Sequence, residues 1–242
     1  MSGKILRAAV LAASALVLFG TGARADGPTG GEAPSSWAGL YLGLQAGGGW
    51  SSTDWTGPAD FYQVDTFSSD LSGWLFGGHV GYNFQRGPWV FGAEVSYSGS
   101  TLRDTVVGPV EIFPNDAFTT KVEDLLTVTG RIGYATSNWL LYARGGYANG
   151  EVTLSGLSGE PVAGVTFSSS ERLNGWTAGA GLEYKLTRNI VLGLEYNFVN
   201  LSGSSFATTT SGPEPLGGSQ VGIDMDDVDI HTVKGRLSVL LQ

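Results

Sequence analysis

Residues 175–200 read GWTAGAGLEYKLTRNIVLGLEYNFVN, and this stretch decides the fold. In each half, apolar side chains alternate with glycine, small polar residues and a single carboxylate, and the polar segment 185–189 separates the halves. Successive side chains of a strand point to opposite faces, so each half is predicted to be a strand with one apolar face. The opposite face suits a crowded polar lumen better than solvent. The two halves therefore predict one hairpin of a transmembrane β-barrel.

The same alternation recurs in six further segments of the chain. They cover residues 38–50, 71–84, 89–97, 123–135, 139–148 and 228–241. Short polar turns alternate with long polar segments, which are expected to be loops at 51–70, 98–122, 149–172 and 201–225. Outer-membrane barrels have an even number of strands, short periplasmic turns and longer extracellular loops. The predicted fold class is therefore all-β: an eight-stranded antiparallel up-and-down transmembrane β-barrel.

Charged residues inside the strands all fall on the less apolar face. They are Glu94, Arg131, Arg144, Glu183, Glu195, Lys234 and Arg236. A basic side chain facing lipid at the midplane would cost about 2–4 kcal/mol, so this placement supports the barrel. We predict that these charges pair in one lumen network, with inward glycines leaving room for the long side chains. The network could seal the lumen, or it could act as an ion gate or as a narrow path for protons or water.

His79 lies on the same lumen face, and it is predicted to be a hydrogen-bonded filler of the charge network rather than a ligand or a base.

Aromatic residues gather at both ends of the predicted strands. Those beside the short turns are Tyr82, Phe84, Trp89, Tyr134, Trp139 and Tyr184. Those beside the long segments are Trp50, Trp74, Tyr97, Tyr147, Trp176 and Phe198. Aromatic girdles of this kind are expected at the two interfaces of a membrane.

The N-terminus predicts export. Lys4 and Arg7 precede an apolar run, and Ala23-Arg24-Ala25 follows it, which is typical of a cleaved signal peptide rather than a membrane-anchoring helix. The predicted organisation is a signal peptide at 1–25, a flexible periplasmic leader at 26–36 and the barrel domain at 37–242. Cleavage would remove three cations and no acids, lowering the formal charge from −9 to −12. Such an acidic chain is not expected to bind nucleic acid, and the absence of cysteine excludes disulfides.

Four segments carry a resemblance to a known family: WAGLYLGLQAGGGW (37–50), GGHVGYNFQ (77–85), GRIGYATSNWLLYARGGYANG (130–150) and GLEYKLTRNIVLGLEYNF (181–198). The mature chain resembles OmpA-like eight-stranded barrels, and more closely the porin-family surface antigens of alphaproteobacteria. The resemblance implies the outer membrane of a Gram-negative cell, with outer-membrane lipid, lipopolysaccharide and the barrel-assembly machinery as partners. The family usually ends in an aromatic residue that this machinery recognises, whereas this chain ends Val239-Leu240-Leu241-Gln242.

Three functions are compatible with these features. The first is an integral structural protein and surface antigen that supports envelope integrity, expected to be a monomer because a closed barrel needs no partner. The second is a surface binding protein that takes an adhesion target or haem on its loops. The third is a narrow, low-conductance porin.

Enzymatic and metal chemistry have weak support. No nucleophile elbow, phosphate-binding loop or zinc-protease motif occurs, and His231 with Asp229 is the only catalytic candidate near the rim. No cofactor is expected. A cation could bind the acidic run at the outer rim, bridging lipopolysaccharide phosphates, although such a run is also typical of a solvated surface. Its candidate ligands are Asp224, Asp226, Asp227 and Asp229.

Overall fold

The computed structural model describes residues 36–56, 67–107, 117–157, 164–212, 218 and 220–241. Within these residues, no helix is long and apolar enough to cross a membrane. The strands are β1 (Gly39–Thr56), β2 (Phe67–Arg86), β3 (Trp89–Val107), β4 (Ala117–Ala135), β5 (Trp139–Leu157), β6 (Thr166–Lys185), β7 (Ile190–Leu201), β8 (Ser204–Thr209), β9 (Gln220–Met225) and β10 (Val228–Leu241).

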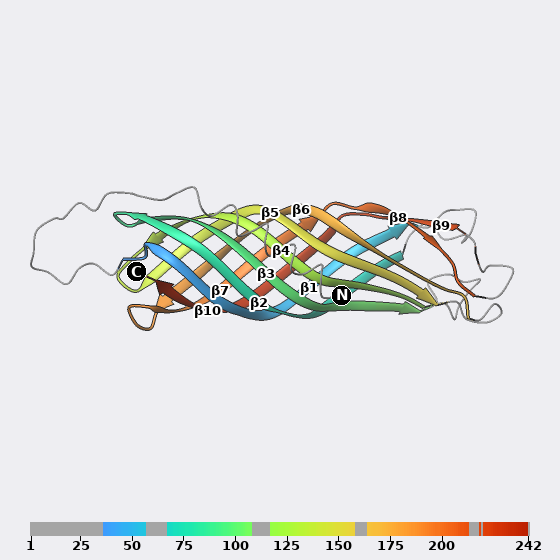
Figure 1. The fold of residues 1–242 in the computed structure, drawn as a ribbon, viewed down its shortest axis with the longest axis horizontal. Coiled ribbons are helices and arrows are strands. Elements are labelled where there is room, and N and C mark those ends of the chain that lie inside the picture. Colours follow the sequence, from blue (N-terminus) through green and yellow to red (C-terminus); the bar gives the residue numbers. More distant parts are fainter. Residues whose placement is uncertain are drawn as a thin grey trace, which may run out of the picture. The chain divides into compact units, whose positions relative to one another are not determined.

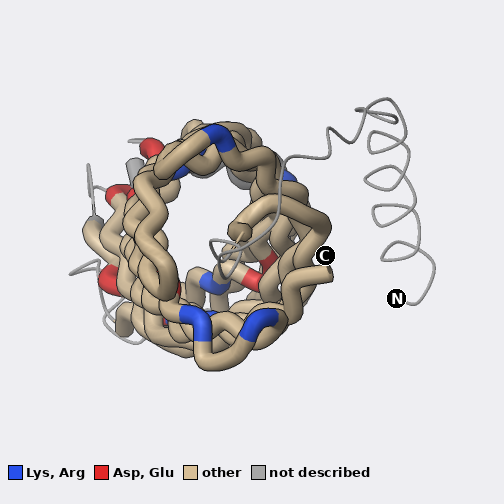
Figure 2. The backbone as a smooth tube through the Cα atoms, turned by 90° about the vertical axis from the view of Figure 1, so that its left-hand side faces the viewer, with Lys and Arg blue, Asp and Glu red and all other residues tan. Residues whose placement is uncertain are grey.

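Eight of these strands form a closed antiparallel ring. β1 to β6 each pair with the next strand, β7 pairs with β10, and β10 pairs with β1 from Leu40↔Leu241 to Ser52↔Asp229. The strands are strongly tilted relative to the barrel axis, and the view along the axis shows the ring closed (Figures 1 and 2). The predicted eight-stranded up-and-down barrel is confirmed, and closure leaves no strand edge unpaired within the bilayer.

The remaining two strands complete the extracellular end of the wall. β7 and β10 have 12 and 14 residues, whereas β1 to β6 have 18 to 20. The hairpin of β8 and β9 occupies the place above the two shorter strands. β9 continues the sheet beside β1 at Trp55↔Met225, and Ser211, just after β8, forms a bridge with Thr166 of β6.

The predicted loop boundaries were wrong. Much of the sequence expected as loops at 51–70, 98–122, 149–172 and 201–225 is strand. The first three of these strands continue to Thr56, Val107 and Leu157, where the described residues break off. The reason is an exchange of faces along each strand. Between the two aromatic girdles most apolar side chains point outward, whereas above the outer girdle most point inward, as Val122 does between exposed Lys121 and Glu123. A wall standing in water follows the soluble rule of apolar inside and polar outside.

The interior is therefore layered along the barrel axis. Near the short turns lies an apolar cluster that includes Trp37, Leu140 and Val191. The middle holds the charged residues. At the extracellular end a second apolar cluster fills the ring, and we call it the upper core: Leu71, Leu75, Leu102, Val122, Leu125, Ala148, Val152, Leu154, Leu173, Val199, Leu201, Met225, Val228 and Ile230.

The inward glycines have two roles, of which the sequence suggested one. Some make room for side chains, since a methyl group at Gly92 would press on the Arg131 stem and one at Gly193 on Glu183. Other inward glycines allow the backbone of the neighbouring strand to come close. A methyl group at Gly47 or Gly175 would overlap the main-chain carbonyl of the neighbouring strand, so glycine also permits the close, coiled strand approach of a narrow barrel.

Two adjacent glycines of β1 test this second role. Gly47→Ala should lower the free energy of unfolding by about 1–3 kcal/mol, because its methyl group would collide with the Val233 carbonyl. Gly48→Ala is the matched control, since the nearest atom to its methyl group is the Gly73 carbonyl oxygen at 4.0 Å. Urea unfolding of the refolded barrel in detergent measures both. Equal losses for the two variants would show that contact with the neighbouring strand is not the reason for glycine at Gly47.

Candidate functional site

The candidate site is the charged middle layer of the lumen. Glu94 of β3 is 2% exposed and accepts hydrogen bonds from two guanidinium groups, Arg144 Nη1 at 2.9 Å and Arg236 Nη2 at 2.5 Å. The hydroxyl of Tyr41 donates to the same carboxylate at 2.8 Å. Donors from the adjacent strands β1 and β10 and from the more distant β5 thus converge on one carboxylate.

Glu195 of β7 is the second centre and is fully buried. Arg144 Nη1 donates to it at 2.8 Å, Arg236 also donates, and the Tyr142 hydroxyl donates at 2.6 Å. Lys234 Nζ lies 3.9 Å from its other oxygen. Because Arg144 and Arg236 each contact both Glu94 and Glu195, the two carboxylates belong to one cluster.

Arg131 of β4 extends the cluster toward the short-turn end. Its guanidinium donates to Glu183 at 3.0 Å and to Asn83 at 2.9 Å, and it lies 3.9 Å from Glu94. Its central carbon sits 4.3 Å from the Tyr41 ring centre and 5.1 Å from that of Tyr142, within range of cation–π attraction.

The structure thus brings all seven charged residues of the proposed network into contact. The four cations and three carboxylates come from β3, β4, β5, β6, β7 and β10, and each is at most 6% exposed. Charges so far from water are stable only when paired and hydrogen-bonded. The arrangement holds its members in fixed positions, which suits a structural element across the lumen.

His79 lies apart from the ion pairs. Its Nε2 is 2.8 Å from the hydroxyl of Ser238, and the side chain is buried. No ion pair with a carboxylate joins it to the charged cluster among the described residues. Its position is that of a hydrogen-bonded filler beside the network.

Two tyrosines and one tryptophan were missed from the sequence. Tyr41 and Tyr142 point inward opposite glycines: a methyl group at Gly81 or Gly181 would overlap their rings. An aromatic residue on the lumen-facing side of a strand, opposite a glycine of the neighbouring strand, is a signal that could have identified both tyrosines.

Trp37 closes the interior at the short-turn end. It is 1% exposed, its indole donates to the Thr136 carbonyl at 3.2 Å, and its backbone N–H donates to the Gln85 side chain at 2.6 Å. Lys185 Nζ lies 4.5 Å from the indole ring centre and donates to the Ser36 carbonyl at 2.6 Å. Because Trp37 precedes the first strand, no alternation pattern in the sequence indicated its position.

The acidic run at the outer rim forms hydrogen bonds within the protein. Asn200 Nδ2 donates to Asp229 at 2.8 Å and to Asp227 at 3.3 Å, and Asp227 also accepts from the Gly203 N–H. Asp226 is exposed, and the side chain of Asp224 lies outside the described residues. In the part of the chain that the structure describes, no three His, Asp or Glu side chains form a group suited to a metal ion.

His231 and Asp229, the weakly supported catalytic candidates, have other partners, and Asp229 accepts a hydrogen bond from Asn200. His231 Nδ1 lies 2.8 Å from the Tyr196 hydroxyl, and its ring stacks on Trp50 with centroids 5.6 Å apart. This places His231 within the outward-facing aromatic layer.

Nine of the twelve predicted girdle residues, the tryptophans and tyrosines other than Tyr97, mark two levels of the outer wall. Trp74 is 69% exposed, and the rest of the outer level consists of Trp50, Tyr147 and Trp176. The level beside the short turns is formed by Tyr82, Trp89, Tyr134, Trp139 and Tyr184. Within it, Trp89 packs edge-on against Tyr134 at 5.6 Å and Trp139 packs against Tyr184 at 4.5 Å.

An ion cluster on the outside of the wall contrasts with the lumen. Arg172 Nη2 donates to Glu151 at 2.7 Å and to Asp124 at 3.0 Å, and its side chain is 46% exposed. Partial burial lowers the pKa of Arg172, but the two carboxylates more than offset this and raise it above its ordinary value. Such a half-exposed cluster contributes little to stability.

Comparison with known proteins agrees with this architecture. The model of the family described as outer membrane protein beta-barrel domain matches residues 11–236. The 31 kDa outer-membrane immunogenic protein of Brucella melitensis is 33% identical over 211 residues, covering 79% of this chain and 86% of that protein. The 22 kDa outer membrane protein of Rhizobium leguminosarum is 34% identical over 179 residues, covering 72% and 71% respectively.

Among solved structures, the outer membrane protease OmpT from Escherichia coli superimposes with a TM-score of 0.54 at 12% identity, covering 84% of this chain and 97% of that chain. At this identity the likeness concerns the fold alone. The predicted family resemblance and outer-membrane location are confirmed. The chain belongs to the family of outer-membrane proteins built on the outer membrane protein β-barrel domain.

Proposed function

We propose that this protein is a non-conducting structural barrel that supports the outer membrane and presents a surface-exposed antigenic wall. The observation that carries the proposal is the charged cluster centred on Glu94 and Glu195. An eight-stranded barrel is just wide enough for side chains to fill, and here the filling side chains are long, buried and mutually bonded.

Two further layers support a sealed lumen. Trp37 and its neighbours lie between the charged cluster and the short turns, and the upper core lies on its extracellular side. A hydrated ion would have to pass two apolar layers and separate ion pairs whose members would then be buried without partners.

Conductance measurement tests the sealed lumen. The purified full chain, inserted into a planar bilayer, should give no stable conductance steps, while an open porin recorded under the same conditions verifies the assay. Stable, reproducible steps of any size would contradict the proposal, and small ones would favour a narrow porin.

The envelope role has its own test. A strain lacking the gene should become sensitive to detergents, and the wild-type gene should restore resistance. Unchanged resistance together with loss of binding to a surface ligand would favour a receptor.

The antigenic role is supported by the relatives whose names describe outer-membrane immunogenic proteins, and by the polar outer face that β2 to β6 present above the outer girdle. Antibodies against the folded protein should label intact cells. Lipid, lipopolysaccharide and the assembly machinery are its proposed partners, and a monomer is proposed because the ring pairs all its own strands through the bilayer.

We also propose that the protein is not an enzyme. His231, the one catalytic candidate, hydrogen-bonds to Tyr196 and stacks on Trp50 rather than facing a carboxylate. Protease and lipase assays of the refolded chain should show no activity above that of a His231→Ala variant.

A further inference from the structure

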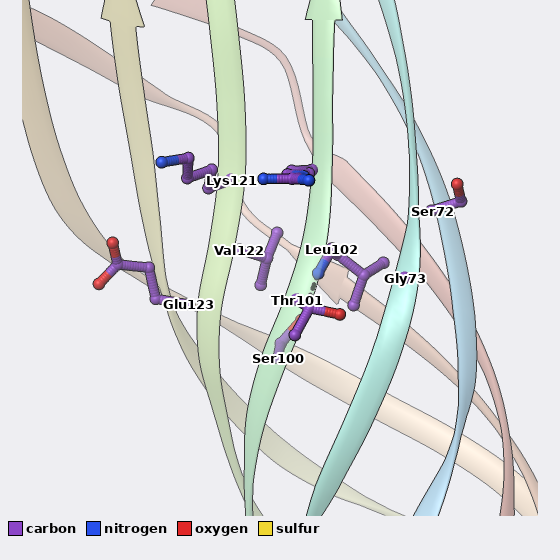
Figure 3. Close-up of a pocket in the computed structure, with 9 residues that line it drawn as sticks. Ser72, Gly73, Ser100, Thr101, Leu102, Lys121, Val122 and Glu123 are labelled. Carbon is purple, nitrogen blue, oxygen red and sulfur yellow. Dashed lines mark hydrogen bonds between the residues drawn. The ribbon is translucent and has the colours of Figure 1, made fainter.

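A hollow of about 650 Å³ lies on the outer wall where β2, β3 and β4 run side by side (Figure 3). Its lining combines the exposed residues Ser72, Arg103, Lys121 and Glu123 on the outer face with buried Leu102 and Val122 of the upper core. It exists because the sheet is irregular here: the pairing of β3 with β4 shifts between Gly99 and Leu102. The irregularity parts the wall and leaves room for a ligand.

Two cations lie side by side on neighbouring strands at the edge of this hollow. Arg103 and Lys121 are direct partners in the β3–β4 register and both are exposed. Like charges directly opposite each other on a sheet repel. Neither forms an ion pair with any residue that the structure describes, although the chain has 22 acids against 13 Lys and Arg residues. Glu123, on the same strand as Lys121, also lines the hollow, and none of the ion pairs among the described residues includes it (Figure 3).

The height of the pair relates it to the membrane. Ser72 pairs with Arg103, and Trp74 of the outer girdle lies two residues below Ser72 on the same face of β2. Two residues of strand rise by about 7 Å along a tilted strand, so the cations lie just beyond the hydrocarbon edge. In the outer leaflet this level is occupied by lipid headgroups.

We propose that Arg103 and Lys121 together bind a phosphate group of an outer-leaflet glycolipid, such as the phosphorylated disaccharide of lipid A. An anion between the two cations would turn their repulsion into attraction to a common partner. Guanidinium offers a forked donor pair to phosphate oxygens, ammonium adds a point charge, and the hydroxyl of Ser72 can donate beside them. The assignment rests on the proposed partnership with lipopolysaccharide, and it does not depend on whether the barrel conducts.

Binding of diphosphorylated lipid A to the full chain in detergent tests the site, read by native mass spectrometry at increasing salt. The wild-type barrel should hold lipid A, and Arg103→Gln with Lys121→Gln should weaken binding by roughly thirtyfold, the effect of two cations near an anionic lipid surface. Glu123→Gln should tighten binding, because it removes the one carboxylate at the hollow.

The matched control removes equal charge from the other end of the barrel. Arg86→Gln with Arg188→Gln changes two exposed cations beside the short turns and should leave lipid A binding unchanged. Heat-modified mobility on gels verifies that every variant is folded.

Four outcomes would overturn the assignment. They are equal weakening by both double variants, equal binding of dephosphorylated lipid A, equal binding of phosphatidylglycerol, and displacement of lipid A by low millimolar inorganic phosphate. The last would show a site for free phosphate rather than for a lipid headgroup.

Discussion

Replacing Glu195 with Gln should lower the free energy of unfolding by about 3–5 kcal/mol, the largest loss we expect from a single polar substitution in this chain. Glu195 is fully buried and receives hydrogen bonds from Arg144 and Arg236, with Lys234 3.9 Å away. The neutral amide has nearly the same size, so the loss measures charge rather than packing. Urea unfolding in detergent, followed by tryptophan fluorescence, gives the value.

Two comparisons separate the lumen effect from charge removal in general. Glu151→Gln removes a carboxylate from the half-exposed Arg172 cluster and should cost at most about 1 kcal/mol. Lys234→Met added to Glu195→Gln should recover part of the loss, because the lumen then has one fewer uncompensated cation. A Glu195→Gln loss no greater than that of Glu151→Gln would show that the lumen charges are solvated.

Leu154→Ala should cost about 2–5 kcal/mol, because it opens a cavity in the upper core. Leu154 is fully buried, although it lies in a segment whose sequence looks like a polar loop. Urea unfolding should show the loss, and hydrogen exchange should increase in the extracellular parts of β4, β5 and β6 more than beside the short turns.

Leu157→Ala is the natural control for this substitution. It changes the same residue type on the same strand, but Leu157 is 52% exposed, so the expected change is below about 0.5 kcal/mol. Similar effects of the two substitutions would mean that the extracellular wall is not held together by an apolar core.

The sequence was most informative where membrane and lumen impose opposite demands on alternating residues. The alternation around Trp176 and Leu194 predicted both the strand and the lipid-facing side, and the number of strands followed from repeating it. The alternation did not predict the strands above the outer girdle, because Ser and Thr point outward there and the apolar residues are spaced among glycines. There a strand in water resembles a polar loop.

For the site, the alternation of side chains along each strand predicted which charged residues point into the lumen, but not which ion pairs they form. Arg144 could have bonded to any lumen carboxylate, and its contacts with Glu94 and Glu195 depend on barrel width, strand slant and rotamer. The hollow beside Arg103 was also hidden, because a register shift between strands leaves no mark on periodicity. Trp37 lies outside any strand, so only the three-dimensional arrangement reveals its position.

The exchange of faces along each strand also determines how deep the barrel sits. From Phe84 to Trp74 the outward row of β2 is apolar, a band about 25 Å tall for a strand of this tilt. Directly above it, Asp70 and Ser72 point outward, so sliding toward the cell interior would bring these polar groups into hydrocarbon. At the other end exposed Arg86 follows Phe84 on the same face, so sliding toward the exterior would do the same. In a thicker bilayer, hydrophobic mismatch must therefore be met by thinning of the surrounding lipid rather than by movement of the protein.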